Sequence, residues 1–129
     1  MDKYLEILPG KLLNRGYFLN NEYIKGVGIA FKYDDMLCVL KILCDNNISV
    51  LGGDVYYLES GLIEFGNGLD NWYTNYNEDE RYDSYIERSL SDTKKYLDDT
   101  KLNDNFLYTA VVANEIDFYK LKKQLYTND

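Results

Sequence analysis

The spacing of apolar residues changes after residue 33, which marks the passage from a strand to a helix. From there on apolar side chains recur every three or four residues, and this predicts a helix over 34–45 with one apolar face. Asp34 is the expected N-cap of this helix. Asn46-Asn47 are expected to end it, because asparagine tolerates the left-handed conformation found after helices.

A longer helix is predicted from Asn77 or Asp79 to about Thr100. Apolar and tyrosine side chains recur there at four-residue spacing, and carboxylates in its first turns complement the positive end of the helix dipole. Two short helices are predicted near the ends of the chain. One covers residues 4–8 and stops before the single proline, and the other follows Asn114 as its cap.

Five segments show the alternation, or the β-branched and aromatic content, that is typical of strands. They are residues 27–33, 48–58, 62–65, 71–73 and 106–112. Within the second segment, Gly52-Gly53 predict a bulge or bend. Glu59-Ser60-Gly61 predict a tight turn that joins the second and third segments as a β-hairpin.

These elements define the fold class that the sequence predicts. A chain of 129 residues, of which 46% are hydrophobic, is long enough for one core, and it contains no internal repeat, low-complexity tract or linker. We therefore predict a single α+β domain over residues 1–129. A mixed or antiparallel sheet of about five strands is expected to pack against two to three helices.

The sequence also predicts a soluble protein of the cytoplasm. It has no run of 18 apolar residues that could span a membrane, and the charges among its first six residues are unlike a secretory signal. Cys38 and Cys44 lie six residues apart in a predicted helix and therefore on different faces. We expect both to be free thiols that serve as small buried apolar residues, which indicates a reducing compartment.

The chain contains no histidine, which limits the chemistry it could catalyse. Ser/His and Cys/His nucleophile pairs are excluded, and the commonest general base and metal ligand is missing. Gly26-Val27-Gly28 lacks the third glycine of a dinucleotide site, and the run from Asn75 to Ile86 lacks the glycine and glutamate of an EF-hand loop. We therefore predict no catalytic residue, no metal and no cofactor. A carboxylate-dependent glycan hydrolase stays open as the enzymatic alternative.

Charge is distributed unevenly along the chain. Residues 1–53 and 93–129 each carry six acidic and six basic side chains, whereas residues 54–92 carry ten acidic side chains and only Arg81 and Arg88. The formal charge of −8 therefore belongs to the middle segment. Folding does not require this segregation, but a concentrated negative field attracts basic partners and repels nucleic acids and anionic membranes.

Aromatic side chains accompany these acids, since residues 54–92 include eight of them. Tyrosine and tryptophan dominate interface hot spots, and surrounding acids steer a basic partner toward the surface. The candidate partner-binding residues are Asp54, Asp70, Trp72, Tyr76, Glu78, Asp79, Glu80 and Asp83. The last four are expected to lie exposed near the start of the long helix, with Trp72 or Tyr76 close by.

Three short blocks in the same region resemble a known family. They are Leu51-Gly52-Gly53-Asp54-Val55-Tyr56, Asp70-Asn71-Trp72-Tyr73 and Tyr85-Ile86-Glu87-Arg88-Ser89. In this order and spacing they look like the family called immunity protein forty, from bacterial polymorphic toxin systems, over residues about 35–97. A structural interpretation of the blocks places the glycines at a bend, Trp72 in the core and Ser89 against a neighbouring helix.

The resemblance implies a cytosolic protein that is made beside a secreted toxin, which it binds and neutralises. It implies no catalytic residue. Many toxins of this kind are nucleases with basic grooves, which an acidic surface could occupy by imitating phosphates. The first hypothesis is therefore an immunity protein that sequesters a basic toxin domain and binds neither nucleic acid nor membrane. A different acidic adaptor or DNA-mimic inhibitor is the alternative, and the sequence leaves the oligomeric state open.

Overall fold

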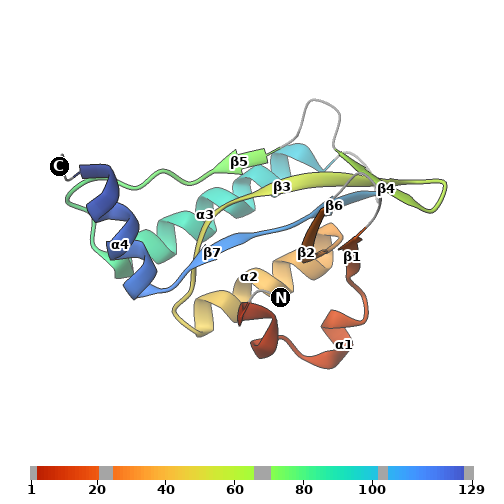
Figure 1. Ribbon diagram of the computed structural model, residues 1–129, viewed down its shortest axis with the longest axis horizontal. Coiled ribbons are helices and arrows are strands. Elements are labelled where there is room, and N and C mark those ends of the chain that lie inside the picture. The colour runs from red at the N-terminus through yellow and green to blue at the C-terminus, as the bar shows by residue number, and fades with distance from the viewer. Residues whose placement is uncertain (1–2, 21–24, 66–70, 102–104, 127–129) are drawn as a thin grey trace.

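A computed structural model describes residues 3–20, 25–65, 71–101 and 105–126 of the chain (Figure 1). Within these residues a 3₁₀ helix over Lys3–Ile7 precedes four α-helices. These are α1 (Gly10–Leu13), α2 (Tyr33–Asp45), α3 (Tyr82–Thr100) and α4 (Glu115–Tyr126). The strands are β1 (Tyr17–Asn20), β2 (Lys25–Ala30), β3 (Ser49–Glu59), β4 (Leu62–Phe65), β5 (Asn71–Tyr73), β6 (Phe106–Tyr108) and β7 (Val111–Ala113). The predicted α+β class is confirmed.

The long strand β3 is the centre of the main sheet, and each of its edges is covered by two short antiparallel strands. Gly52 is paired with Tyr73 of β5 on one side and with Val111 of β7 on the other. Further along, Tyr56 is paired with β4 on one side and with β6 on the other. The sheet is therefore entirely antiparallel and in effect three strands wide. A separate two-stranded sheet is formed by β1 and β2.

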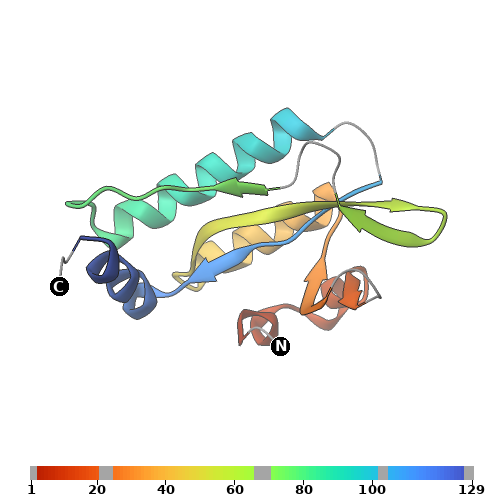
Figure 2. The same ribbon diagram turned by 45° about the horizontal axis from the view of Figure 1, so that its top comes forward.

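Each face of β3 packs against a different layer, because alternate side chains of a strand point to opposite faces. Val50 and Val55 belong to the main core, together with buried residues of α2 and with Leu97 of α3. On the other face, Tyr56 packs with Leu107 of β6 and with buried residues of the small β1–β2 sheet. Figures 1 and 2 show α3 running alongside the sheet, with the β3–β4 hairpin at the end of the molecule opposite α4.

The predicted bend at Gly52-Gly53 is confirmed, and its cause is the close approach of neighbouring backbones. The register between β3 and β7 shifts between Val50 and Gly52. A Cβ atom on Gly52 would lie 2.2 Å from the carbonyl oxygen of Trp72. One on Gly53 would lie 2.0 Å from the carbonyl oxygen of Thr109 and 2.4 Å from the ring of Trp72. Only glycine fits at either position.

The predicted hairpin is also confirmed. Glu59 is paired with Leu62, so that Ser60 and Gly61 form a two-residue turn between β3 and β4. Both turn residues have positive φ, 53° at Ser60 and 80° at Gly61. This is the conformation whose twist matches the twist of the two strands.

The ends of two helices differ from the prediction. Helix α2 ends as expected, with Asn47 in the left-handed conformation at φ 58°, but Lys32 rather than Asp34 occupies its N-cap position. Helix α3 begins only at Tyr82. Before it, residues 77–80 form a turn in which the Glu80 amide donates to the Asn77 carbonyl, 3.0 Å away. The carboxylate of Glu80 also accepts the amide of Asn77 at 3.1 Å, which closes the turn and leaves residues 77–80 outside the helix.

Three strand predictions are corrected by the tertiary pairing. The segment 27–33 is a strand only as far as Ala30, because Phe31 bridges to Tyr108 and Tyr33 opens α2. The segment 106–112 is divided into β6 and β7 at Thr109-Ala110, beside the bulge of β3. Strand β1 was not predicted at all. Its partner β2 and the underlying β3 layer stabilise it, and its own sequence has little alternation.

The two cysteines are free, as predicted, but neither is buried. Cys38 and Cys44 are both exposed, while Val39, Leu40 and Leu43 of the same helix are buried. The expectation that the thiols serve as small core residues is therefore wrong.

Candidate partner-binding surface

The segment from Thr74 to Arg81 links β5 to the start of α3, and α4 packs beside it (Figure 1). Helix α4 is held in place at its start by Asn114, whose Oδ1 accepts the Asp117 amide at 2.8 Å, as the sequence predicted. The segment is therefore joined to β5 and α3 at its two ends and packs against α4. We call residues 74–81 the acidic segment, because Glu78, Asp79 and Glu80 lie within it.

The acidic segment packs against a cluster of aromatic side chains from α3 and α4. Phe118 of α4 is fully buried, and its ring stacks on Tyr85 of α3 with centroids 4.8 Å apart. Tyr76 of the acidic segment contacts the same ring edge-on at 5.1 Å, and Tyr82 contacts it at 5.2 Å. These contacts join the acidic segment, α3 and α4 into one packed unit.

Two tyrosine hydroxyls of this cluster are buried and hydrogen-bonded to the backbone. Tyr85 donates to the carbonyl oxygen of Thr74 at 2.7 Å, and burial raises its pKa to about 12. The Tyr82 hydroxyl lies 2.6 Å from the carbonyl oxygen of Asn47 and accepts the amide of Ser49 at 3.1 Å. Burial also raises the pKa of Tyr82. Both phenols are therefore neutral near pH 7 and act as structural donors.

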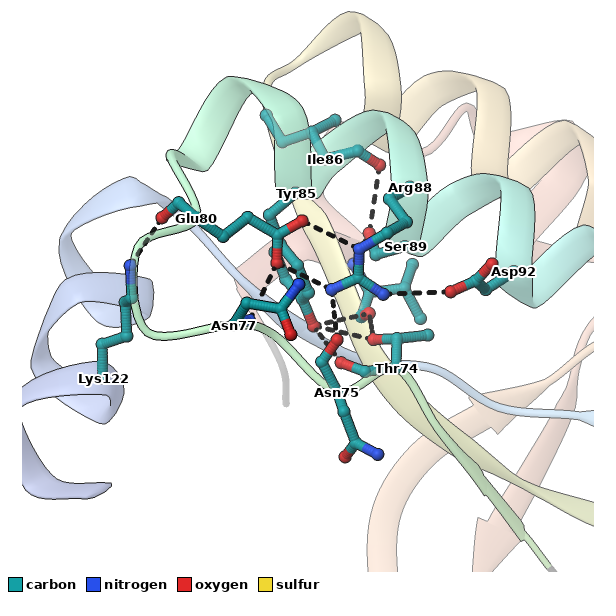
Figure 3. A network of polar contacts seen from close by, with 11 residues as sticks. Thr74, Asn75, Asn77, Glu80, Tyr85, Ile86, Arg88, Ser89, Asp92 and Lys122 are labelled. Atoms are coloured by element: carbon teal, nitrogen blue, oxygen red, sulfur yellow. Dashed lines mark hydrogen bonds and ion pairs between the residues drawn. The ribbon is translucent and has the colours of Figure 1, made fainter. Parts of the chain in front are cut away.

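The polar network above the cluster is centred on Arg88 of α3 (Figure 3). Its Nε and Nη2 atoms donate to the two carboxylate oxygens of Glu80, at 2.8 and 2.7 Å. Nη2 also donates to the backbone carbonyl of Asn75, and Nη1 donates to Asp92 at 3.1 Å. One guanidinium thus contacts the acidic segment at two points and α3 at a third, which the planar geometry of arginine permits.

Glu80 is consequently occupied within the protein. Its side chain is only 9% exposed, and its Oε1 atom also accepts the amide of Asn77 at 3.1 Å. Its own carbonyl oxygen accepts a hydrogen bond from Lys122 of α4 at 2.6 Å. The hydrogen bond from Arg88 lowers the pKa of Glu80, while partial burial opposes that shift. The expectation that Glu80 lies exposed is therefore wrong, and its charge is neutralised locally by Arg88.

The other three carboxylates near the start of α3 are exposed, as predicted. Glu78 and Asp79 lie at the tip of the acidic segment. The Asp83 side chain is 78% exposed and lies 3.8 Å from Arg81, which is 83% exposed. Solvent screens this ion pair, which therefore contributes little to stability. Asp83 also borders a hollow of about 300 Å³ between α3 and α4. The residues that line this hollow are Asn47, Arg81, Tyr82, Asp83, Ile86, Glu115 and Tyr119.

The remaining candidates are not gathered at this surface. Trp72 is buried, its ring stacks on Tyr96 at 4.8 Å, and its indole nitrogen donates to Thr93 at 3.1 Å. Asp54 is half-buried and paired with Asn71, so it lies at the far end of β5 from the acidic segment. Tyr76 is half-buried in the aromatic cluster, and Asp70 lies outside the described residues. Burial leaves Trp72 little surface for direct contact with a partner.

Among the exposed apolar side chains that the sequence analysis did not assign to the surface, three lie on β5 and α4, the elements next to the acidic segment. Tyr73 is 74% exposed, Ile116 is 67% exposed and Tyr119 is 46% exposed. Strand alternation would have placed Tyr73 opposite the buried Trp72. Helical periodicity would have placed Ile116 and Tyr119 off the buried face that Phe118 marks.

Two further properties concern the described part of the chain. Within it, no helix has the length and apolar character needed to cross a membrane. The same residues include no group of three or more cysteine, aspartate or glutamate side chains arranged to hold a metal ion.

Comparison with known proteins identifies the family. The sequence model of the family described as Immunity protein 40 matches residues 15–112. The chain belongs to this family. Neither a curated protein nor a solved structure matches it. Membership in the Immunity protein 40 family indicates a role in toxin immunity, as an inhibitor rather than an enzyme.

The family-like blocks meet around β3 in this Immunity protein 40 member. Gly53 lies under the ring of Trp72, and the Ser89 hydroxyl of α3 accepts the amide of Val50 at 3.1 Å. The structural interpretation of the glycines and of Trp72 is thereby confirmed. Ser89 differs from expectation, because it contacts a strand rather than a neighbouring helix. The blocks therefore hold α3 and β5 onto β3, the support on which the acidic segment is carried.

Proposed function

We propose that this Immunity protein 40 member neutralises a basic toxin domain in the cytoplasm by binding it at the start of α3. The proposed contact surface consists of the exposed carboxylates Glu78, Asp79 and Asp83. The exposed side chains of Tyr119 and Ile116 on α4 border it. The sequence also suggested five other partner-binding residues, Asp54, Asp70, Trp72, Tyr76 and Glu80. Of these, Trp72, Tyr76 and Glu80 would act by supporting the surface, not by contacting the toxin.

The observation that carries the proposal is the placement of exposed negative charge. The chain is balanced outside residues 54–92, and within that range Arg88 is engaged with Glu80 and Asp92. Of the three exposed acids near the start of α3, Asp83 lies 3.8 Å from Arg81, and both side chains are largely exposed, so this ion pair offsets little of the negative charge. A protruding negative surface steers a basic partner and raises its association rate.

Aromatic side chains beside such charges supply contact area at low entropic cost. Tyr119 is exposed, and its ring contacts the buried Phe118 edge-on with centroids 5.1 Å apart. If the toxin is a nuclease, its phosphate-binding groove is basic, and the three carboxylates would occupy positions that phosphates otherwise take. The same charges would disfavour binding of nucleic acid to the immunity protein itself.

The direct test compares two charge-matched triple variants. The first, E78Q/D79N/D83N, removes the three acids of the proposed surface. The control, D34N/E59Q/D99N, removes three exposed acids outside the acidic segment, in the first turn of α2, at the end of β3 and in the last turn of α3. Both change the net charge by the same amount. The probe is the purified, catalytically inactivated protein encoded by the neighbouring reading frame, immobilised for kinetic measurements at low and at physiological salt.

We expect the first variant to slow association about tenfold at low salt and to flatten its salt dependence, because screening already weakens steering at higher ionic strength. The control should keep the rate within about twofold of the unmodified protein. Protection of cells that express the toxin should fall with the first variant only. Equal slowing by both variants, or by neither, would show that the acidic surface is not the contact site.

A further inference from the structure

We propose that Arg88 is a positioning residue for toxin binding, a role that rests on the proposed function. In this view Arg88 does not touch the toxin. It fixes the acidic segment in the conformation that presents Glu78 and Asp79. The gain is preorganisation, because a loop that is already ordered loses less entropy when its partner arrives.

Arg88 contacts the acidic segment at more than one point, and we call its hydrogen bonds to Asn75 and Glu80 the clamp. Arg88 holds the segment near its start, through the carbonyl of Asn75, and near its end, through both oxygens of Glu80 (Figure 3). Lys122 of α4 holds the carbonyl of Glu80 from the opposite side. Glu78 and Asp79 lie between these fixed points, within the turn that joins Asn77 to Glu80.

The contacts of Arg88 also exceed those of an ordinary surface pair. Its side chain is 34% exposed and Glu80 is 9% exposed, so solvent screens the pair only partly. The guanidinium lies over the ring of Tyr85, with 5.3 Å from Cζ to the centroid, which restricts it further. Lysine could keep the charge, but a single ammonium cannot reach both oxygens of Glu80 and the carbonyl of Asn75 in this planar arrangement.

The sequence provides a matched control in Arg81, the only other base in residues 54–92. Its side chain is 83% exposed, and its contact with Asp83 is 3.8 Å long. R81Q and R88Q therefore remove the same charge from the same end of the molecule, but only R88Q opens the clamp. R88K opens the clamp while keeping the charge.

Two measurements test the proposal. In the free protein, hydrogen exchange of the amides in residues 75–81 should accelerate about tenfold in R88Q and R88K and stay unchanged in R81Q. Exchange of the β3 amides should stay slow in all three variants, which shows that the fold is intact. Against the inactivated product of the neighbouring reading frame, dissociation should be about three- to tenfold faster for R88Q and R88K only.

A double variant tests whether Arg88 and Glu80 act together. If the clamp acts as one unit, E80Q/R88Q should dissociate no faster than R88Q alone, because either substitution opens it. Equal dissociation rates for R81Q and R88Q, or an unchanged exchange rate of residues 75–81 in R88K, would overturn the positioning role. Failure of the proposed function would appear elsewhere, as an unchanged association rate in E78Q/D79N/D83N, a variant that leaves Arg88 intact.

Discussion

Replacement of Gly53 by alanine is the sharpest test of how β3 is packed. The added Cβ atom would lie 2.0 Å from the carbonyl oxygen of Thr109 and 2.4 Å from the ring of Trp72, both well inside van der Waals contact. The first neighbour is backbone and the second is a buried ring that stacks on Tyr96. Neither can move away without displacing the strand or the core around it.

The cost of such overpacking is typically about 1–3 kcal/mol and rises when backbone must shift. For Gly53 we expect at least about 2 kcal/mol, because two neighbours on opposite sides have to move. For a chain of this length that corresponds to a fall in Tm of roughly 6–10 °C. Left-handed backbone strain does not contribute, since Gly53 is not among the glycines with positive φ.

Gly28 is the matched control, since it is also a strand glycine without positive φ. A Cβ atom there would meet only Leu19, at an ordinary 3.9 Å. G28A should therefore change the free energy of unfolding by less than about 1 kcal/mol, in either direction. Urea unfolding followed by far-ultraviolet circular dichroism measures both variants. Equal stability of G53A and G28A would refute the close approach of β3 to its neighbours.

Two further predictions concern the thiols and the pH dependence of the clamp. Cys38 and Cys44 are exposed, so both should react with a thiol reagent in the native protein, and C38A/C44A should unfold within about 0.5 kcal/mol of the unmodified protein. An intramolecular disulfide found by mass spectrometry would contradict this. Because the folded-state pKa of Glu80 is lowered from 4.5, its ion pair stabilises the fold above that pH and is lost as pH falls through the folded-state pKa. The stability gap between the unmodified protein and E80Q should therefore narrow in acid denaturation series below pH 4.5, and a gap that stays constant would exclude Arg88 as its source.

The local sequence was sufficient where local chemistry decides the conformation. Helix α2 follows its apolar period, and Asn47 takes the left-handed conformation after it. The β3–β4 turn requires two residues with positive φ, which Ser60-Gly61 supply. The paired glycines predicted a bend, because no other residue allows such close backbone contact. These features were predicted without any knowledge of what lies next to them in space.

Tertiary packing decided the rest. Composition placed Trp72 and Glu80 on the partner-binding surface, but Thr93 and Tyr96 hold Trp72 in the core, and Arg88 neutralises Glu80 from two turns into α3. No local signal pairs Glu80 with Arg88 or brings Lys122 across from α4.

The sequence by itself determined the α+β class, the main helices, the hairpin and the segregation of charge, because each depends on residues close together in the chain. The division of the acids between exposed and paired positions depended on which side chains the fold brings together. An acidic residue is the same letter in the sequence whether its carboxylate lies in water or is bound to a guanidinium. Only the neighbours that β3, α3 and α4 place around it distinguish the two cases.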